Sequence, residues 1–293
     1  MENVMRHDIK ILIAGGDMRQ AHCAARLARR YGVTLAGFDS SALPADIRHL
    51  AGAPDTVGEF DFAVLPMRGL GSDGNITAPH FSAVLAAADV AAAVRGGGTV
   101  FTGLADARLA ELFPRHSLVS YMEREELLLK NAALTAEGAV QLALERLDVA
   151  LCGLPVLIVG LGRIGTSLAM ILRGFGADVT AAVRSPKAAA KAEMLGVKSV
   201  YTNDIGGGHA LVFNTSPETV FTRGNLSISH RNTLFIELAS GEGGFSREAA
   251  DMLGENLMRA GGLPAKKAPV TAGEIVADAV SALVEEGGGS CGD

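Results

Sequence analysis

The sequence predicts an α/β protein in which two parallel-sheet domains are joined by one long helix. Three observations indicate this fold. Apolar stretches of strand length alternate with helical patterns, which is typical of parallel sheets. The alternation is interrupted once, around residues 123–147, by a pattern that is helical throughout. Finally, a chain of 293 residues exceeds one ordinary hydrophobic core, so two domains are expected.

The first domain is expected to span residues 1–122. Its alternating pattern indicates a small parallel sheet of the flavodoxin-like or Rossmann-like kind, which we interpret as a substrate domain. The predicted strands are 9–14, 34–38, 62–65 and 99–102, separated by helical or loop segments such as 20–31 and 81–94.

The remaining chain divides into four predicted segments. The connecting helix, 123–148, has Leu and Ala at helical spacing and one weak point at Gly138. Residues 149–270 repeat the strand and helix alternation and predict a Rossmann domain. Residues 271–286 predict an amphipathic helix that packs back on the N-terminal domain, and the Gly-rich residues 287–293 predict a flexible tail.

Composition excludes several classes of function. The net charge of −6 and the pI near 5.7 provide no basic field for nucleic acid or for an anionic membrane. The N-terminus lacks a signal-peptide pattern and no apolar run is long enough to cross a membrane, so a cytoplasmic protein is expected. Cys23 and Cys152 are expected to be buried thiols, and no residue spacing indicates a metal site.

The stretch VLIVGLGRIGTSL predicts a dinucleotide site. Gly160, Gly162 and Gly165 match G-x-G-x-x-G, with Arg163 and Ile164 inside the turn. The three glycines permit a tight turn, close approach of a pyrophosphate and close helix packing, respectively. A glycine-rich structural turn is the alternative, but a strand, a helix and a second strand all fall where the motif requires them.

The residues after the second strand of this motif favour NADP. An NAD site usually has an acidic residue there, whereas this chain has Arg184, Ser185 and Lys187. A guanidinium and a hydroxyl suit a 2′-phosphate. The alternative is a surface arginine and an NAD site formed by other contacts.

Two later strand ends are candidates for the nicotinamide end of the cofactor. Asn214, Thr215 and Ser216 in NTSP are expected near the nicotinamide and its ribose, although an Asn-Thr turn closed by proline would have the same sequence. Ala239, in ELASGEGG, is expected to line the same site.

A second glycine turn, GGDMRQ, begins the first helix and is expected to hold a carboxylate. Gly16, Arg19 and Gln20 lie where a parallel strand meets a helix, which is where open α/β folds bind ligands. The alternative interpretation makes Asp17 the N-cap of the helix and the ion-pair partner of Arg19.

The ordered motifs resemble the family of dipicolinate synthase A subunits. The likeness runs from about residue 9 to 285 and rests on GGDMRQ, NAALTAEGAVQLALE, GLGRIGTSLA followed by AVRS, NTSP, ELASGEGGFS and GGLPAKKAPVTAGEI. The first and last of these are much more specific than the cofactor turn. One departure concerns the lysines, because Lys266 and Lys267 precede the Ala-Pro pair and Val270 follows it.

The resemblance implies that the chain oxidises a dihydrodipicolinate-level precursor, formed from hydroxytetrahydrodipicolinate of the lysine pathway, to dipicolinate during bacterial sporulation. It implies NADP as the acceptor, a partner in the form of a flavoprotein-like B subunit, and a location in the mother cell. A homo-oligomer is also expected.

Such a reaction requires cations for two carboxylates and at most a mild base. Arg19 is expected to bind one carboxylate, Lys266 or Arg163 the other, and Asp17 or Glu137 is the candidate base.

Two other functions stay open. The domain order also resembles 2-hydroxyacid dehydrogenases and adenosylhomocysteine hydrolase, which would predict an acidic residue at position 184 and, for hydroxyacid chemistry, a His-carboxylate pair. Neither is evident in the sequence. A non-catalytic protein that binds NADP within a complex is the third possibility, and turnover by the isolated chain would distinguish it.

Overall fold

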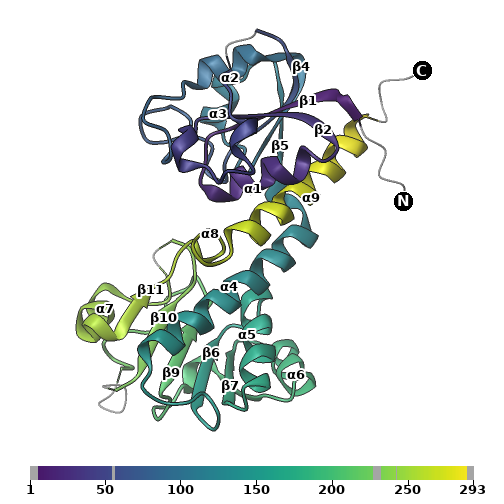
Figure 1. Cartoon of the computed structure of the whole chain (residues 1–293). Coiled ribbons are helices and arrows are strands. Elements are labelled where there is room, and N and C mark those ends of the chain that lie inside the picture. Colours follow the sequence, from purple (N-terminus) through teal and green to yellow (C-terminus); the bar gives the residue numbers. More distant parts are fainter. Residues whose placement is uncertain (1–5, 55–56, 227–231, 242, 289–293) are drawn as a thin grey trace. The chain divides into compact units, whose positions relative to one another are not determined.

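The computed structural model describes residues 6–54, 57–226, 232–241 and 243–288. The chain forms two compact units (Figure 1). The first unit comprises residues 1–130 and 268–293, and the second unit comprises residues 131–267. Helix α4 (Glu125–Arg146) begins in the first and ends in the second.

The first unit contains a five-stranded parallel sheet in the order β2-β1-β3-β4-β5, the flavodoxin-like arrangement. Helices α1, α2 and α3 follow β1, β3 and β4 in the chain. The last strand, β5, was not predicted from the sequence. The bounds are β1 (Arg6–Ala14), α1 (Met18–Leu27), β2 (Tyr31–Ala36), β3 (Phe60–Val64), α2 (Ala87–Ala93), β4 (Val94–Thr102), α3 (Ala107–Leu112) and β5 (Ser117–Ser120).

Strand β1 places apolar side chains on both faces of this sheet. Ile11 and Ile13 belong to one buried cluster, whereas Leu12 and Ala14 belong to another. Successive side chains of a strand point to opposite faces, so a continuous apolar run buries both. The strand is therefore central and must be covered by helices on each side.

Helix α9 (Pro269–Gly288) completes the first unit by packing along α1. The glycine of TAGEI permits this approach, since a Cβ on Gly273 would lie 2.8 Å from the Cβ of His22 and 2.9 Å from the backbone nitrogen of Cys23. Ion pairs join Arg26 to Asp278 (3.3 Å) and Arg30 to Glu285 (2.5 Å). The rest of the predicted tail, 289–293, lies outside the described residues.

The second unit contains a six-stranded parallel sheet in the order β11-β10-β9-β6-β7-β8, the Rossmann arrangement. The predicted fold class is confirmed. The bounds are β6 (Pro155–Val159), α5 (Arg163–Gly174), β7 (Asp178–Val183), α6 (Pro186–Met194), β8 (Lys198–Tyr201), β9 (Leu211–Asn214), β10 (Leu234–Glu237), α7 (Arg247–Leu253), β11 (Leu257–Arg259) and α8 (Leu263–Lys267).

Gly138, the weak point of the connecting helix, has a packing role. It is buried in α4, and a Cβ at this position would lie 3.1 Å from the Cβ of Leu263 in α8. The glycine lowers helix propensity but lets α8 approach α4 closely.

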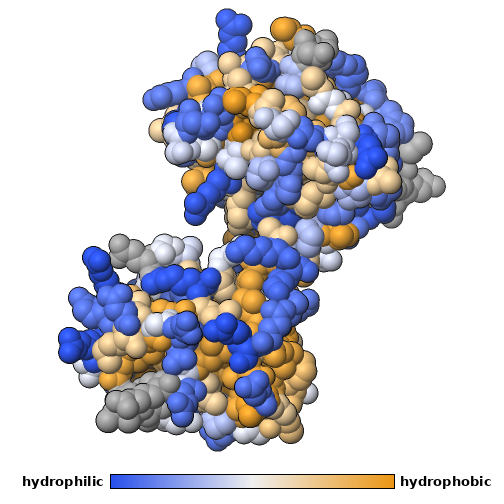
Figure 2. All heavy atoms as spheres, turned by 60° about the vertical axis from the view of Figure 1, so that its left-hand side comes forward, coloured by the Kyte–Doolittle hydropathy of each residue, from blue (hydrophilic) through white to orange (hydrophobic). Residues whose placement is uncertain are grey.

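The surface of both units is mixed. Figure 2 shows hydrophilic side chains over the visible faces of both units, with apolar side chains gathered on part of the second.

One prediction about the cysteines is wrong: Cys152 is exposed, because it lies in the turn before β6 rather than in the sheet, whereas Cys23 is buried. Among the helices in the described ranges, none combines the length and apolarity that a membrane span requires.

Candidate cofactor and substrate sites

The glycine turn of the second unit has the geometry of a pyrophosphate cradle. Gly160, directly after β6, has a φ of +89°, which favours glycine. A Cβ on Gly165 would collide with the carbonyl oxygen of Gly160, so the helix can lie this close to the strand only with glycine there. A Cβ on Gly162 would meet no atom within 4 Å. Space for a ligand therefore opens at the start of α5.

The start of α5 is suited to an anion. Gly162 is the N-cap and supplies no side-chain hydrogen bond to the first amides, and Arg163 is exposed in the first turn next to half-buried Ile164. Backbone N–H groups and the positive end of the helix dipole attract phosphate at such a position.

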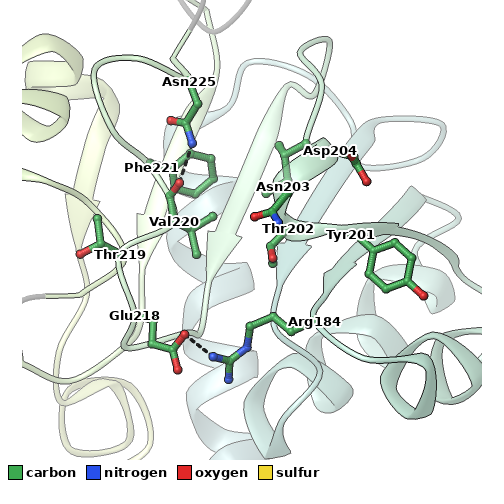
Figure 3. A pocket seen from close by; sticks show the side chains of 11 residues that line it. Arg184, Tyr201, Thr202, Asn203, Asp204, Glu218, Thr219, Val220, Phe221 and Asn225 are labelled. Atoms are coloured by element: carbon green, nitrogen blue, oxygen red, sulfur yellow. Dashed lines mark hydrogen bonds and ion pairs between the residues drawn. The ribbon is translucent and has the colours of Figure 1, made fainter.

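Two cavities, one of which contains the glycine turn, share Arg184 and Thr202 in their linings. The first, of about 560 Å³, contains the turn itself. The second, of about 740 Å³, lies beyond the ends of β7, β8 and β9 (Figure 3). Together they follow the carboxyl ends of the central strands, where this fold binds dinucleotides. Lining residues of the first that were predicted from the sequence are Gly160, Gly162, Arg184, Ser185, Thr215 and Ser216.

Arg184 points across the second cavity toward Glu218, with which it forms an ion pair (Figure 3). Ser185 is the N-cap of α6, and its hydroxyl accepts a hydrogen bond from the Ala188 backbone N–H at 3.2 Å. Lys187 is exposed. Lys191, one helical turn further on, instead donates from Nζ to the Leu161 carbonyl of the glycine turn at 3.0 Å.

Lys191 is thus a candidate cofactor residue that sequence analysis missed. It lies four positions after Lys187 and therefore on the same helix face, a spacing that could have revealed it. Its ammonium has three donors, so two stay available for phosphate oxygens beside the turn.

Asn214 does not line either cavity but lies fully buried between two strand ends. Its Nδ2 donates to both carboxylate oxygens of Glu237, at 2.8 and 2.9 Å, and to the Ser216 carbonyl at 2.8 Å. The Asn214 amide is therefore held by contacts inside the protein, and its contact with nicotinamide stays a prediction. Thr215 and Ser216 do reach the cavity that contains the glycine turn, and the Thr215 hydroxyl donates to the Val159 carbonyl at 2.8 Å.

Glu237 organises the loop that contains Ala239. Its side chain is only 3% exposed and accepts the Ala239 N–H at 2.8 Å and the Gly244 N–H at 2.7 Å, besides the amide of Asn214. We call Asn214, Glu237, Ala239 and Gly244 the buried latch. It fixes the ends of β9 and β10 relative to one another, next to the cavity that contains the glycine turn. Ala239 contributes its backbone to this latch and lines neither of the two cavities.

The GGDMRQ turn of the first unit adopts the arrangement that sequence analysis kept as its alternative. Asp17 is the N-cap of α1 and accepts the Arg19 backbone N–H at 3.0 Å. The Arg19 side chain donates to the same carboxylate from Nε at 2.9 Å and from Nη2 at 2.7 Å. The Arg19 side chain is only 16% exposed, so this is a two-point, partly buried ion pair.

The electrostatics of this pair disfavour Asp17 as a base. Burial alone would raise the pKa of Asp17, but the hydrogen bonds and charge of Arg19 outweigh it and hold that pKa below its usual value. A carboxylate whose pKa is lowered is a weak proton acceptor at neutral pH. Asp17 instead orients Arg19 and keeps it charged.

The backbone of this turn is already hydrogen bonded inside the protein. Gly15 N–H donates to the Ala36 carbonyl at 2.9 Å, and Gly16 N–H donates to the Thr77 carbonyl at 2.6 Å. Gln20 is buried and donates from Nε2 to the Leu65 carbonyl at 2.8 Å. The Gly15 and Gly16 amides are therefore not available to a carboxylate, whereas the outer nitrogens of Arg19 are not used by Asp17.

Arg68 is a second cation at this sheet edge that sequence analysis missed. It follows β3 and is exposed, and within the described residues it forms no ion pair. Its neighbour Met67 lines a small cavity together with Asp17, Arg19 and Gln20. The usable signal was its position in the loop that follows a buried strand of a parallel sheet.

The other predicted substrate and base residues are less enclosed. Lys266 is exposed, while Lys267 forms an ion pair with Glu145 at 3.2 Å. Glu137 is exposed on α4, and its side chain forms no hydrogen bond or ion pair with another described residue. The two candidate bases lie in different units, Asp17 in the first and Glu137 in the second. Over the described ranges, no group of three or more His, Cys, Asp or Glu residues could hold a metal ion.

Comparison with known proteins agrees with this architecture. Residues 10–122 match the N-terminal domain of the dipicolinate synthase A subunit, and residues 130–242 match the NAD-binding domain of D-isomer-specific 2-hydroxyacid dehydrogenases. The dipicolinate synthase A subunit of Bacillus subtilis (strain 168) is 27% identical over 292 residues, which covers 95% of this chain and 96% of that protein. The resemblance to dipicolinate synthase A subunits is confirmed.

Crystal structures of two such proteins have the same fold over nearly the whole chain. The one from Bacillus subtilis has a TM-score of 0.84 at 27% identity, covering 97% of this chain and 98% of its own. The one from Bacillus halodurans has a TM-score of 0.82 at 26% identity, covering 96% and 99%. The chain is accordingly an oxidoreductase that uses a nicotinamide cofactor.

Proposed function

We propose that the chain is the dehydrogenase component of a dipicolinate synthase, which oxidises a dihydrodipicolinate-level precursor with NADP. The observation that carries the proposal is the similarity along nearly the whole chain to dipicolinate synthase A subunits. Arg184 at the end of β7, where an acidic residue would favour NAD, supports NADP. Lys191 beside the glycine turn adds a second cation for phosphate.

The chemistry asks little of the protein beyond binding and orientation. A bound nicotinamide accepts a hydride from the dihydropyridine ring, and one proton leaves as the ring becomes aromatic. Aromatisation supplies much of the driving force. The chain must hold a dicarboxylate in a fixed orientation, and Arg19, kept charged and oriented by Asp17, provides one cation for it. Glu137 stays a candidate base and Lys266 a candidate carboxylate ligand.

We infer that Arg68 binds a substrate carboxylate. The charge of Arg19 is balanced by Asp17, so the pair alone offers a dianion no net charge. Arg68 follows Met67 of that cavity's lining in the chain and carries no internal counter-ion among the described residues. The proposed ligand set is therefore one oriented and one free guanidinium.

The first test follows dipicolinate and reduced nicotinamide by absorbance, using freshly generated hydroxytetrahydrodipicolinate with NADP or NAD, with and without a B subunit. We expect both products in equal amounts, formed faster with NADP. If dipicolinate never exceeds the enzyme-free control in any combination, the proposed reaction is wrong. A chain that binds NADPH but turns over only with its partner would instead be a non-catalytic component of the complex.

The ligand role of Arg68 has its own test. Arg68→Ala should lower kcat/KM for the dicarboxylate by about 10- to 100-fold, because a charge-assisted hydrogen-bond pair is lost. Arg68→Lys should restore part of it. Arg115→Ala is the matched control, since Arg115 is also exposed but precedes β5, at the opposite edge of the sheet. Equal effects at positions 68 and 115 would contradict the assignment.

The relatives are named as the A subunit of an enzyme, which supports a partner for this chain as well. We propose that the partner is a flavoprotein-like B subunit, and that the complex acts in sporulation, in the mother cell, as the resemblance implies. A homo-oligomer stays a prediction. Sedimentation of the purified chain, alone and mixed with a B subunit, would test both assemblies.

A further inference from the structure

The ion pair between Arg184 and Glu218 spans the cavity in which we propose that the adenosine half of the cofactor binds. Arg184 follows β7 and Glu218 follows β9, the two strands on either side of β6 and its glycine turn. Their side chains point toward one another, and both line the same cavity (Figure 3). The pair therefore joins the two loops that flank the predicted phosphate site.

The Glu218 carboxylate can be replaced on Arg184 by another anion. The Arg184 side chain is 59% exposed and that of Glu218 is 63% exposed, so water screens their attraction. A phosphate monoester is nearly doubly charged at neutral pH and offers arginine two oxygens at once. It is the stronger partner for Arg184 wherever it can reach the guanidinium.

We propose that Glu218 sets the balance between NADP and NAD by occupying the 2′-phosphate position on Arg184. The inference rests on the proposed nicotinamide site. When NADP binds, the phosphate replaces the Glu218 carboxylate, which becomes a like charge nearby and weakens binding. When NAD binds, Glu218 keeps its pair with Arg184 and can accept a hydrogen bond from the ribose hydroxyl, as the acidic residue of NAD sites does.

Other groups around the cavity do not substitute for Glu218. Tyr201, Thr202 and Asn203 are uncharged and supply hydrogen bonds to either cofactor. Asp204 is the other acidic residue of the lining and forms no ion pair among the described residues. It provides a control for a general effect of negative charge, because Glu218 is the acidic residue of this lining that is bound to Arg184.

The test measures dissociation constants of NADPH and NADH for the full chain by nucleotide fluorescence. Glu218→Gln should tighten NADPH about two- to fivefold and leave NADH unchanged or weaker, since removing a surface ion pair frees Arg184. The gain should shrink as salt is raised. In Arg184→Gln, NADPH should weaken at least tenfold, and adding Glu218→Gln should then give no gain. Asp204→Asn should change both constants in the same proportion.

The outcomes distinguish a wrong cofactor site from a wrong role for Glu218. If neither nucleotide binds the unmodified chain, the proposed cofactor site itself is wrong. If both bind but Glu218→Gln leaves the ratio of the two constants unchanged, or Asp204→Asn shifts the ratio equally, Glu218 does not determine specificity. A gain for NADPH that persists without Arg184 would also overturn the proposal.

Discussion

Among single residues, the Asp17–Arg19 pair shows how one motif can serve a site by positioning rather than by direct chemistry. Asp17 caps α1 and fixes the guanidinium at two nitrogens, which leaves the outer face of Arg19 for a ligand. Burial alone would lower the pKa of Arg19, but the bonds to Asp17 outweigh it and raise that pKa. The arginine therefore stays a cation in a partly buried place.

The pair should make stability depend on pH. Because the pKa of folded Asp17 lies below the ordinary value of 3.8, the pair stabilises the fold above about pH 4 and loses this effect as pH falls through the lowered pKa. Asp17→Asn, which keeps a capping residue, should cost about 0.5–1 kcal/mol at pH 7 after allowance for solvent screening.

Urea unfolding of both proteins at pH 7 and near pH 3 checks this prediction. The difference in unfolding free energy should be smaller near pH 3 than at pH 7, because protonation of Asp17 begins to remove the charge of the pair. If the difference in unfolding free energy is the same at pH 7 and near pH 3, the N-cap hydrogen bond of Asp17, rather than its charge, stabilises the fold.

Among the secondary-structure elements, β9 and β10 are joined by the buried latch although their ends are far apart in sequence. Glu237 at the end of β10 holds Asn214 at the end of β9 and the backbone of the loop that follows β10. Gly243 leaves room for the Glu237 carboxylate, because a Cβ at this position would lie 2.5 Å from a Glu237 oxygen. The glycines of ELASGEGG thus let the loop fold around a carboxylate.

Glu237→Gln should destabilise the second unit by about 2–4 kcal/mol, since an amide places a donor against the amide of Asn214 or against a backbone N–H. Glu193→Gln is the control, as Glu193 is exposed on α6. Chemical unfolding measures both. A change below about 0.5 kcal/mol for Glu237→Gln, which surface positions commonly give, would show that the latch contributes little.

Over the molecule as a whole, each unit has its own hydrophobic clusters, and the first is closed by a helix from the far end of the chain. Gly273 allows α9 to contact the backbone of α1. The latch, the glycine turn and Arg184 all belong to the second unit. We therefore expect damage to the α1–α9 contact to stay within the first unit.

Gly273→Ala should destabilise the first unit by about 1–3 kcal/mol, because the added methyl meets backbone atoms that cannot move aside. Hydrogen exchange should accelerate in α1 and α9 but not in β6 or β9, and NADPH affinity should stay within about twofold. In Gly287→Ala of the same helix, a Cβ meets no atom within 4 Å, so exchange should be unchanged. A loss of NADPH affinity in Gly273→Ala well beyond this range would contradict the independence of the two units.

Local patterns in the sequence were sufficient for the fold class, the glycine turn and the family resemblance. Apolar runs of strand length, glycines at fixed spacing and the family motifs are each continuous in the chain, so they can be recognised without knowing which segments meet. Strand β5 was missed because its short, half-buried pattern, SLVS, carries little periodic signal.

The folded chain was needed to show which polar side chains face a ligand and which face the protein. Asn214, predicted as a cofactor contact, binds a buried carboxylate, whereas Lys191 reaches the glycine turn from another helix. Arg184 has a partner 34 positions away in Glu218. Such pairings depend on which strand ends become neighbours in a parallel sheet, and that order is fixed by packing over long sequence separations rather than by local spacing.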